Sequence, residues 1–199
     1  MINGEWDASR IGELKLENEI VRLRRLSADD RSGYAKIAFN PKIWEYFVST
    51  ISNENDLDAF IEQAVRDLAA GTRVVFSIIE KGSGHVAGST AFGNIVPRER
   101  RLEIGWSWLG QDYQGTSVNR AAKQLLLDHA FDVLACERVE FKTDILNVRA
   151  RRALKGIGAT EEGTLRSFNY MPSGRRRDAV YYSILKSEWP KVRADHFKL

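Results

Sequence analysis

Apolar residues recur at two different spacings along this chain, and the change between them predicts the order of its elements. Alternating apolar residues, or short apolar runs between turn residues, predict strands at about residues 19–26, 73–80, 85–95, 100–109, 138–143, 159–168 and 178–185. Helical spacing predicts helices at about residues 27–39, 54–70, 116–134 and 147–156. This order describes an α/β (α+β) fold in which one mixed sheet carries helices on its faces.

Capping and turn residues predict several of the boundaries. Ser27 precedes two aspartates and is a typical helix N-cap, while Asn40 and Pro41 should end the same helix. Lys81–Gly84 is expected to be the hairpin turn between the second and third strands. We expect residues 1–18 to be an N-terminal extension, 19–186 to be one domain, and 187–199 to be a C-terminal tail or short helix.

The strand at 100–109 and the helix at 116–134 each predict a division of faces. Strict alternation in the strand places four apolar side chains on one face: Leu102, Ile104, Trp106 and Trp108. The opposite face would then carry Glu103, Gly105 and Ser107. In the helix, the polar residues form a predicted solvent-facing stripe: Arg120, Lys123, Gln124, Asp128 and Asp132.

The segment that joins this strand to this helix is the best candidate for binding a ligand. Residues Gln114–Asn119 form a glycine-containing turn directly before the helix. The first N–H groups of a helix have no intrahelical partner, and the helix dipole adds partial positive charge there. Such a turn is suited to phosphate, and Glu103 on the preceding strand is a candidate acid–base group beside it.

Composition limits the class of protein. At 199 residues the chain is long enough for one domain with a real core, and its formal charge of +3 does not by itself indicate nucleic acid. A single cysteine, Cys136, excludes an internal disulfide and favours a reducing compartment. The acidic N-terminus does not resemble a signal peptide, and no apolar run is long enough to span a bilayer. We therefore expect a soluble cytoplasmic protein with no membrane partner.

Three segments together carry a resemblance to a known family. Glu103–Leu109 resembles that family's Glu-Ile-Gly-Tyr-Trp-Leu strand with one additional residue, and Gln114–Asn119 lies at its pyrophosphate loop. Phe141–Ala159 resembles its strand, Asn-x-x-Ser/Ala helix and glycine turn. The family is the GCN5-related N-acetyltransferase (GNAT) superfamily, in its RimJ/RimL-like branch. The resemblance implies a mixed, mostly antiparallel central sheet of about seven strands flanked by about four helices, with acetyl-CoA as cosubstrate.

The resemblance also implies roles for particular residues. Glu103 would be the catalytic carboxylate, although a solvated or salt-bridged strand glutamate beside Arg101 is the alternative. Asn147 would bind the pantetheine arm or act as a helix N-cap, and the two interpretations are equally good. The full set that would bind coenzyme A is Trp108, Leu109, Gln114, Gly115, Thr116, Ser117, Val118, Asn119 and Asn147.

The sequence departs from the family pattern at three places. Ser117 and Asn119 stand where the loop usually has Gly and Gly/Ala, and the Ser117 hydroxyl could add a donor to phosphate. The extra residue after Gly105 suggests a β-bulge. Leu154 stands where many members have a tyrosine that acts as the general acid, so no tyrosine acid is assigned.

The acceptor site is defined less clearly. Trp44, Phe47 and Trp106 could wall an acceptor pocket, but aromatic residues at such spacing are more often core. Asp144 could orient the substrate, with an exposed loop aspartate as the more ordinary interpretation. The histidines are scattered and Cys136 has no cysteine partner, so we expect no metal.

The resulting hypothesis is an acetyl-CoA-dependent N-acetyltransferase in which a primary amine attacks the thioester directly. The acceptor would be a protein N-terminal amine or a small amine, and the protein would be a monomer or homodimer. A non-catalytic acyl-CoA-binding or sensing protein is the main alternative. A basic RNA-associated protein is the weaker one, because the arginines at 149–152 and 175–177 are ordinary for a solvated helix face and a turn.

Overall fold

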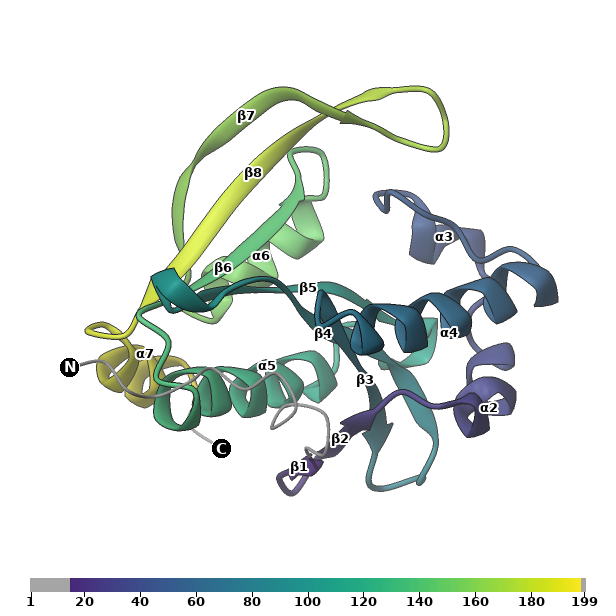
Figure 1. The fold of residues 1–199 in the computed structure, drawn as a ribbon, viewed down its shortest axis with the longest axis horizontal. Helices are drawn as coiled ribbons and strands as arrows, with labels where there is room; N and C mark the ends of the chain where they lie inside the picture. The colour runs from purple at the N-terminus through teal and green to yellow at the C-terminus, as the bar shows by residue number, and fades with distance from the viewer. Residues whose placement is uncertain (1–14, 198–199) are drawn as a thin grey trace.

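The computed structural model of this protein describes residues 15–197, and its strands form one twisted sheet (Figure 1). The eight strands are β1 (Lys15–Glu17), β2 (Val21–Arg25), β3 (Arg73–Glu80), β4 (Val86–Val96), β5 (Arg101–Leu109), β6 (Arg138–Asp144), β7 (Thr160–Tyr170) and β8 (Arg176–Leu185). Their order across the sheet is β1-β2-β3-β4-β5-β6-β8-β7. The β5–β6 pair is parallel and the other pairs are antiparallel, which confirms the predicted mixed, mostly antiparallel sheet.

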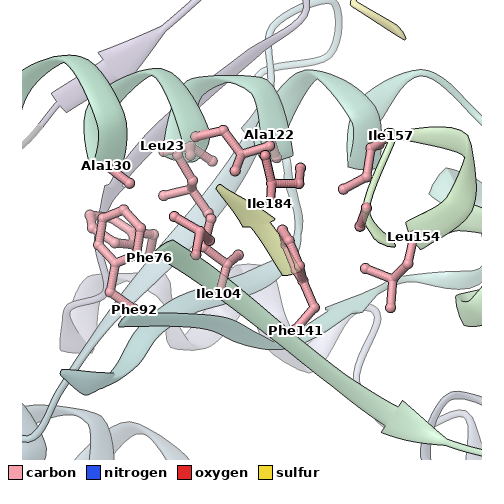
Figure 2. Packing of buried hydrophobic residues seen from close by; sticks show 14 of the residues in the cluster. Leu23, Phe76, Phe92, Ile104, Ala122, Ala130, Phe141, Leu154, Ile157 and Ile184 are labelled. Atoms are coloured by element: carbon pink, nitrogen blue, oxygen red, sulfur yellow. The ribbon is translucent and has the colours of Figure 1, made fainter. Parts of the chain in front are cut away.

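The helices cover both faces of this sheet. They are α2 (Arg31–Ala35), α3 (Pro41–Trp44), α4 (Glu54–Ala69), α5 (Val118–Asp128), α6 (Val148–Gly156) and α7 (Trp189–His196). Side chains from α2, α3 and α4 share one buried cluster, and side chains from α5, α6 and α7 share another. On β3, Phe76 belongs to the α5 cluster and its neighbour Val75 to the α4 cluster, so the two clusters lie on opposite faces. Figure 2 shows part of the α5 cluster.

The described chain contains more elements than the predicted seven strands and four helices. The additional strand, β1, has three residues and is too short for a periodic pattern, yet it pairs with β2. Pro41 begins α3 because proline fits the first turn of a helix, so it does more than end the preceding one. The predicted helix at 27–39 is a single 3₁₀ turn, Ala28–Asp30, followed by α2. The predicted helix at 116–134 is α5 followed by a π-helical turn, His129–Val133.

The expected N-terminal extension and C-terminal tail are described to different extents. Residues 1–14 of the expected N-terminal extension lie outside the described residues. At the other end, α7 packs on the core: Trp189 is buried and its ring lies 5.5 Å from the ring of Phe131. The C-terminal segment therefore includes a short helix that buries apolar surface.

Strand β5 contains the β-bulge that its extra residue suggested. On β4, the two steps from Ser89 to Ala91 face three steps on β5, from Trp108 back to Gly105. Trp106 lies in the bulge with a left-handed backbone, φ +49°. The bulge reverses the alternation of side chains after Gly105, so the predicted division of faces is wrong beyond that point. Leu102 and Ile104 join the α5 cluster, whereas Trp106 and Trp108 pack with the α4 cluster.

Candidate active site

A cleft opens where β5 and β6 separate. The two strands pair only between Arg101–Glu103 and Arg138–Glu140, and beyond Glu103 they are not hydrogen-bonded to one another. Two cavities of about 430 Å³ each occupy the separation. We call the one beside Glu103 the inner cavity and the one beside the Gln114–Asn119 turn the outer cavity. Ser107, Asn119 and Asn147 line both, so the two cavities adjoin.

Glu103 is a buried carboxylate on the wall of the inner cavity. Its residue is 4% exposed, and its Oε2 accepts a hydrogen bond of 2.7 Å from the Asn94 side chain. The Lys142 ammonium lies 3.4 Å from the same oxygen. Glu103 is thus an ion-paired glutamate, but its partner is not Arg101, which pairs with Glu140 instead. A Cβ atom at position 105 would lie 2.8 Å from Oε1, so Gly105 leaves room for the carboxylate.

Lys123 corrects the predicted solvent-facing stripe of the helix. It is 6% exposed and lines the inner cavity, whereas Arg120 and Asp132 of the same stripe are exposed. Its Nζ donates a hydrogen bond of 2.6 Å to the Ser107 hydroxyl. Burial lowers the pKa of Lys123 to about 7, and the charge of Glu103 opposes that shift. The inner cavity therefore contains a lysine able to exchange a proton near neutral pH.

Arg177 adds a second buried cation to the inner cavity. The residue lies on β8 and is 6% exposed. Its Nε atom has no hydrogen-bond partner within residues 15–197. Burial lowers the pKa of Arg177, while the charges of Asp144 and Glu103 raise it. A buried guanidinium without a complete set of acceptors is suited to an oxygen atom of a ligand.

The outer cavity lies beside the turn that was expected to hold phosphate. Its lining includes Trp108, Leu109, Gln114, Gly115, Thr116 and Asn119 from the expected set. Ser117 is exposed and Val118 is buried in the α5 cluster, and neither lines this cavity. Gly115 has a φ of +78°, a conformation that favours glycine. The Thr116 hydroxyl accepts a hydrogen bond of 3.3 Å from the Val118 N–H, one of the first-turn donors of α5.

Three arginines make the outer cavity electropositive. Arg120 extends from α5, and Arg149 and Arg152 extend from α6 across the cleft. Arg149 donates to the Gln114 side-chain oxygen, and the Gln114 amide donates a hydrogen bond of 2.9 Å to the Leu109 carbonyl. Nearby cations and the N-terminus of α5 together favour a phosphate-bearing ligand.

Asn147 and Asp144 both have structural partners. Asn147 is the N-cap of α6 and accepts a hydrogen bond of 3.0 Å from the Ala150 N–H, while its residue also lines both cavities. Asp144 is fully buried, so the expectation of an exposed loop aspartate is wrong. Its carboxylate accepts from the Leu146 N–H at 2.9 Å and pairs with Arg175, and the residue does not line either cavity.

The three candidate aromatic residues have different surroundings. Phe47 lines both cavities and Trp106 lines the inner one. Trp44 is 6% exposed, donates to the Ala38 carbonyl at 2.7 Å, and packs 5.0 Å from the Trp108 ring. Trp44 therefore lies in the core beneath the site, while Phe47 and Trp106 border the cleft.

Sequence reasoning missed Lys123, Lys142 and Arg177 as cleft residues. The sequence did contain a signal for Lys123. Leu126 and Leu127 follow it by three and four positions, and Asn119 precedes it by four. This spacing places Lys123 on the same face of α5 as the two buried leucines. No comparable signal marked Arg177, since an arginine-rich turn precedes it and its place in β8 depends on pairing with Asn169 of β7. Within residues 15–197 no cluster of His, Cys, Asp and Glu could hold a metal, and no helix there could cross a membrane.

Comparisons with known proteins agree with this geometry. A family model described as the acetyltransferase (GNAT) domain matches residues 21–160. The protein named "Putative ribosomal N-acetyltransferase YdaF" of Bacillus subtilis (strain 168) is 28% identical over 179 residues, which cover 86% of this chain and 94% of that one.

Solved structures share the fold. A GCN5-related N-acetyltransferase from Brucella melitensis superposes with a TM-score of 0.84 at 26% identity, over 93% of this chain and 84% of that one. Mycobacterium smegmatis RimJ in complex with CoA-disulfide has a TM-score of 0.75 at 22% identity, over 89% and 88% of the two chains, a likeness of fold. The chain therefore belongs to the GCN5-related N-acetyltransferase (GNAT) family and is an acyltransferase.

Proposed function

We propose that this protein transfers the acetyl group of acetyl-CoA to a primary amine by direct attack of the amine on the thioester. The observation that carries the proposal is the continuity of the cleft. A buried carboxylate, Glu103, lies at one end, and a helix N-terminus with three arginines lies at the other. One extended ligand with a phosphate end and a reactive end would match both.

Glu103 would act as the base. An amine is protonated at neutral pH and cannot attack until its nitrogen has lost a proton. The Glu103 carboxylate would take that proton, directly or through one water molecule, because Gly105 leaves Oε1 accessible. Asn94 and Lys142 bind Oε2 and would hold the carboxylate in position. The neutral nitrogen then attacks the thioester carbonyl, and the thiolate leaves.

Acetyl-CoA would lie along the separated strands. Its pyrophosphate would meet the Gln114–Asn119 turn together with Arg120 and Arg152, and its pantetheine arm would pass Asn147. Trp108 and Leu109, just past the bulge, line the outer cavity and offer backbone groups that β6 does not bind. The thioester would then reach the inner cavity beside Glu103.

The first prediction concerns the phosphate end. Arg152→Gln should raise the KM for acetyl-CoA about tenfold with little change in kcat, because one charge-assisted hydrogen bond, about 1.4 kcal/mol, is lost. Initial rates over a range of acetyl-CoA concentrations measure this effect, which should shrink at high salt. Arg98→Gln removes an arginine whose side chain is 94% exposed and should match the wild type. An unchanged KM for Arg152→Gln would contradict the assignment of the outer cavity.

The acceptor is proposed to be a protein N-terminal amine, with a small primary amine as the alternative. Two observations support this preference. Arg177 presents an incompletely paired guanidinium in the inner cavity, and a peptide offers carbonyl oxygens close to its terminal nitrogen. The Bacillus subtilis relative also carries the name of a ribosomal N-acetyltransferase.

A second prediction tests this acceptor assignment. Arg177→Gln should raise the KM for an acceptor peptide at least tenfold while the KM for acetyl-CoA changes less than about twofold, because only the acceptor loses a charged partner. Arg166→Gln, on the exposed strand β7, is the matched control and should behave as the wild type. Equal increases in both constants would contradict a specific role in acceptor binding.

The proposed function itself is tested by following coenzyme A release with a panel of peptides and amines. Release that depends on acceptor, with an acetylated product of the correct mass, is the expected result. Binding of acetyl-CoA by calorimetry without turnover on any acceptor would favour the non-catalytic alternative. Salt-dependent retention on RNA without acetyl-CoA binding would favour the alternative of an RNA-associated protein. The structure offers little support for that alternative, because Arg151 pairs with Glu161 and Arg175 pairs with Asp144.

A further inference from the structure

Lys123 occupies the wedge between the two separating strands. Its Nζ donates to the Ser107 hydroxyl on β5 at 2.6 Å and lies 3.4 Å from the Thr90 hydroxyl on β4. On the other side, Nζ lies 5.9 Å from the centre of the Phe141 ring on β6. Ser107 and Phe141 both line the inner cavity, so the lysine rises from α5 into the space that the bulge creates.

Burying a lysine costs free energy, so a smaller or apolar residue would be more stable at this position. The presence of lysine therefore suggests that its amine has a role. The Nζ partners are two hydroxyl groups, which compensate the loss of water less well than a carboxylate would. Burial accordingly lowers the pKa of Lys123 to about 7. The neighbouring buried positions of α5, Ala122 and Leu126, are apolar, so the ammonium is exceptional on this face. Perturbed titratable groups in clefts are candidates for chemistry.

The proposed reaction leaves one step without a residue. The departing thiolate needs a proton, and Leu154 is a buried apolar residue unable to provide it. Among the other titratable residues of the inner cavity, Arg177 does not release its proton and Lys142 is ion-paired with Glu103. Tyr46 interacts with Glu45, which raises the pKa of the tyrosine and weakens it as an acid. Lys123 is the group whose acidity and position both suit the step.

We propose that Lys123 is a catalytic residue that donates the proton taken up by the coenzyme A sulfur; this inference rests on the proposed acetyl transfer. As the nitrogen–carbon bond forms, the carbon–sulfur bond breaks and sulfur keeps the electron pair. Sulfur then takes a proton from the Lys123 ammonium and leaves as a thiol. Glu103 takes the proton of the acceptor ammonium before the attack and returns it to solvent. After the nitrogen–carbon bond has formed, the nitrogen loses a second proton, again through Glu103 to solvent, and neutral Lys123 regains one proton from solvent, so that one proton is released per turnover.

Three charged groups face Lys123 in the inner cavity. They are Glu103 on β5, Lys142 on β6 and Arg177 on β8, while the contacts from β4 and Ser107 are hydroxyl groups. Burial disfavours the ammonium form of Lys123, and the charge of Glu103 favours it. Because the donor must be protonated, kcat should fall as pH rises through about 7, the pKa of Lys123. At lower pH, the pH profile of kcat should have a rising limb, which reports deprotonation of the acceptor amine.

The test compares Lys123→Met with Lys191→Met, a control on the exposed side of α7. Lys123→Met should lower kcat about a hundredfold, the scale of general acid catalysis, and change the KM for acetyl-CoA less than about threefold. It should also lose the falling limb of kcat above pH 7 and keep the rising limb. Methionine fills similar space, so thermal unfolding should show no loss of stability. Lys191→Met should match the wild type in all measurements.

Two results would overturn this inference, and neither is the same as failure of the proposed function. A Lys123→Met enzyme with wild-type kcat and an unchanged falling limb would exclude Lys123 as the proton donor, while acetyl transfer itself would stand. A variant that loses acetyl-CoA affinity with normal kcat would assign Lys123 to binding instead. Absence of turnover in the wild type on every acceptor would instead refute the proposed acetyl transfer, and with it this step.

Discussion

Glu103→Gln is expected to lower kcat between about a hundredfold and ten-thousandfold, the range for loss of a general base. Glutamine has the same shape, and its carbonyl oxygen can still accept the hydrogen bond that Asn94 donates at 2.7 Å. Its amide cannot take a proton from the acceptor nitrogen. Acetyl-CoA binding should therefore survive, because the residues proposed to hold the pyrophosphate lie in the outer cavity.

The measurement is coenzyme A release under saturating acetyl-CoA, with calorimetric binding in parallel. Glu62→Gln, on the exposed side of α4, is the matched control and should retain wild-type kcat. The deficit of Glu103→Gln relative to the wild type at the same pH should become smaller as pH rises, because more of the acceptor amine is then neutral without a base. Full activity of the variant at neutral pH would remove Glu103 from the mechanism and leave it as the ion-pair partner of Lys142.

Gly88→Ala is expected to lower the free energy of unfolding by about 3 kcal/mol, at the upper end for overpacking. Gly88 on β4 faces β5 where the backbones approach closely. An added Cβ would overlap the Trp108 carbonyl oxygen and lie 2.8 Å from the Leu109 Cα, and both neighbours are backbone atoms with little freedom to move. The strands would have to separate at the wall of the outer cavity.

Denaturant unfolding of Gly88→Ala and Gly174→Ala tests this expectation. Gly174 has a φ of +81° but no atom within 4 Å of its would-be Cβ, so its substitution costs only the backbone strain, about 1 kcal/mol. Similar losses for the two variants would show that strain, not the contact with β5, limits Gly88. A larger loss for Gly88→Ala, with weaker acetyl-CoA binding, would support the contact.

Strand β5 illustrates both the reach and the limit of sequence reasoning. The additional residue after Gly105 correctly indicated a β-bulge, since a known strand pattern with one insertion must accommodate it. The same stretch also predicts a strict alternation of faces, which a bulge interrupts. A bulge reverses the faces beyond it, so Trp108 packs with the α4 cluster and Ser107 contacts Lys123 of α5. The position of a bulge within a strand is set by the partner strand.

Local chemistry was sufficient for much of the rest. Ser27 caps its helix, Asn147 caps α6, and the strands at 73–80 and 100–109 lie within a residue or so of their predicted bounds. These features depend on neighbours a few residues apart, which a sequence displays directly. The Glu103 strand, the Gln114–Asn119 turn and the Asn147 helix were likewise visible as motifs, and the family follows from them.

The sequence by itself therefore determined the order of the longer strands and helices, the family, and the motifs at the two ends of the cleft. Only the tertiary structure decided what lies between those ends. Lys123 and Arg177 enter the inner cavity because α5 packs beneath the separated strands and β8 pairs with β6. Asp144 is buried because Arg175, 31 residues later, pairs with it. The burial of these side chains, their proton affinity and their positions around the inner cavity all depend on contacts between residues far apart in the chain. No local spacing in the sequence encodes such contacts.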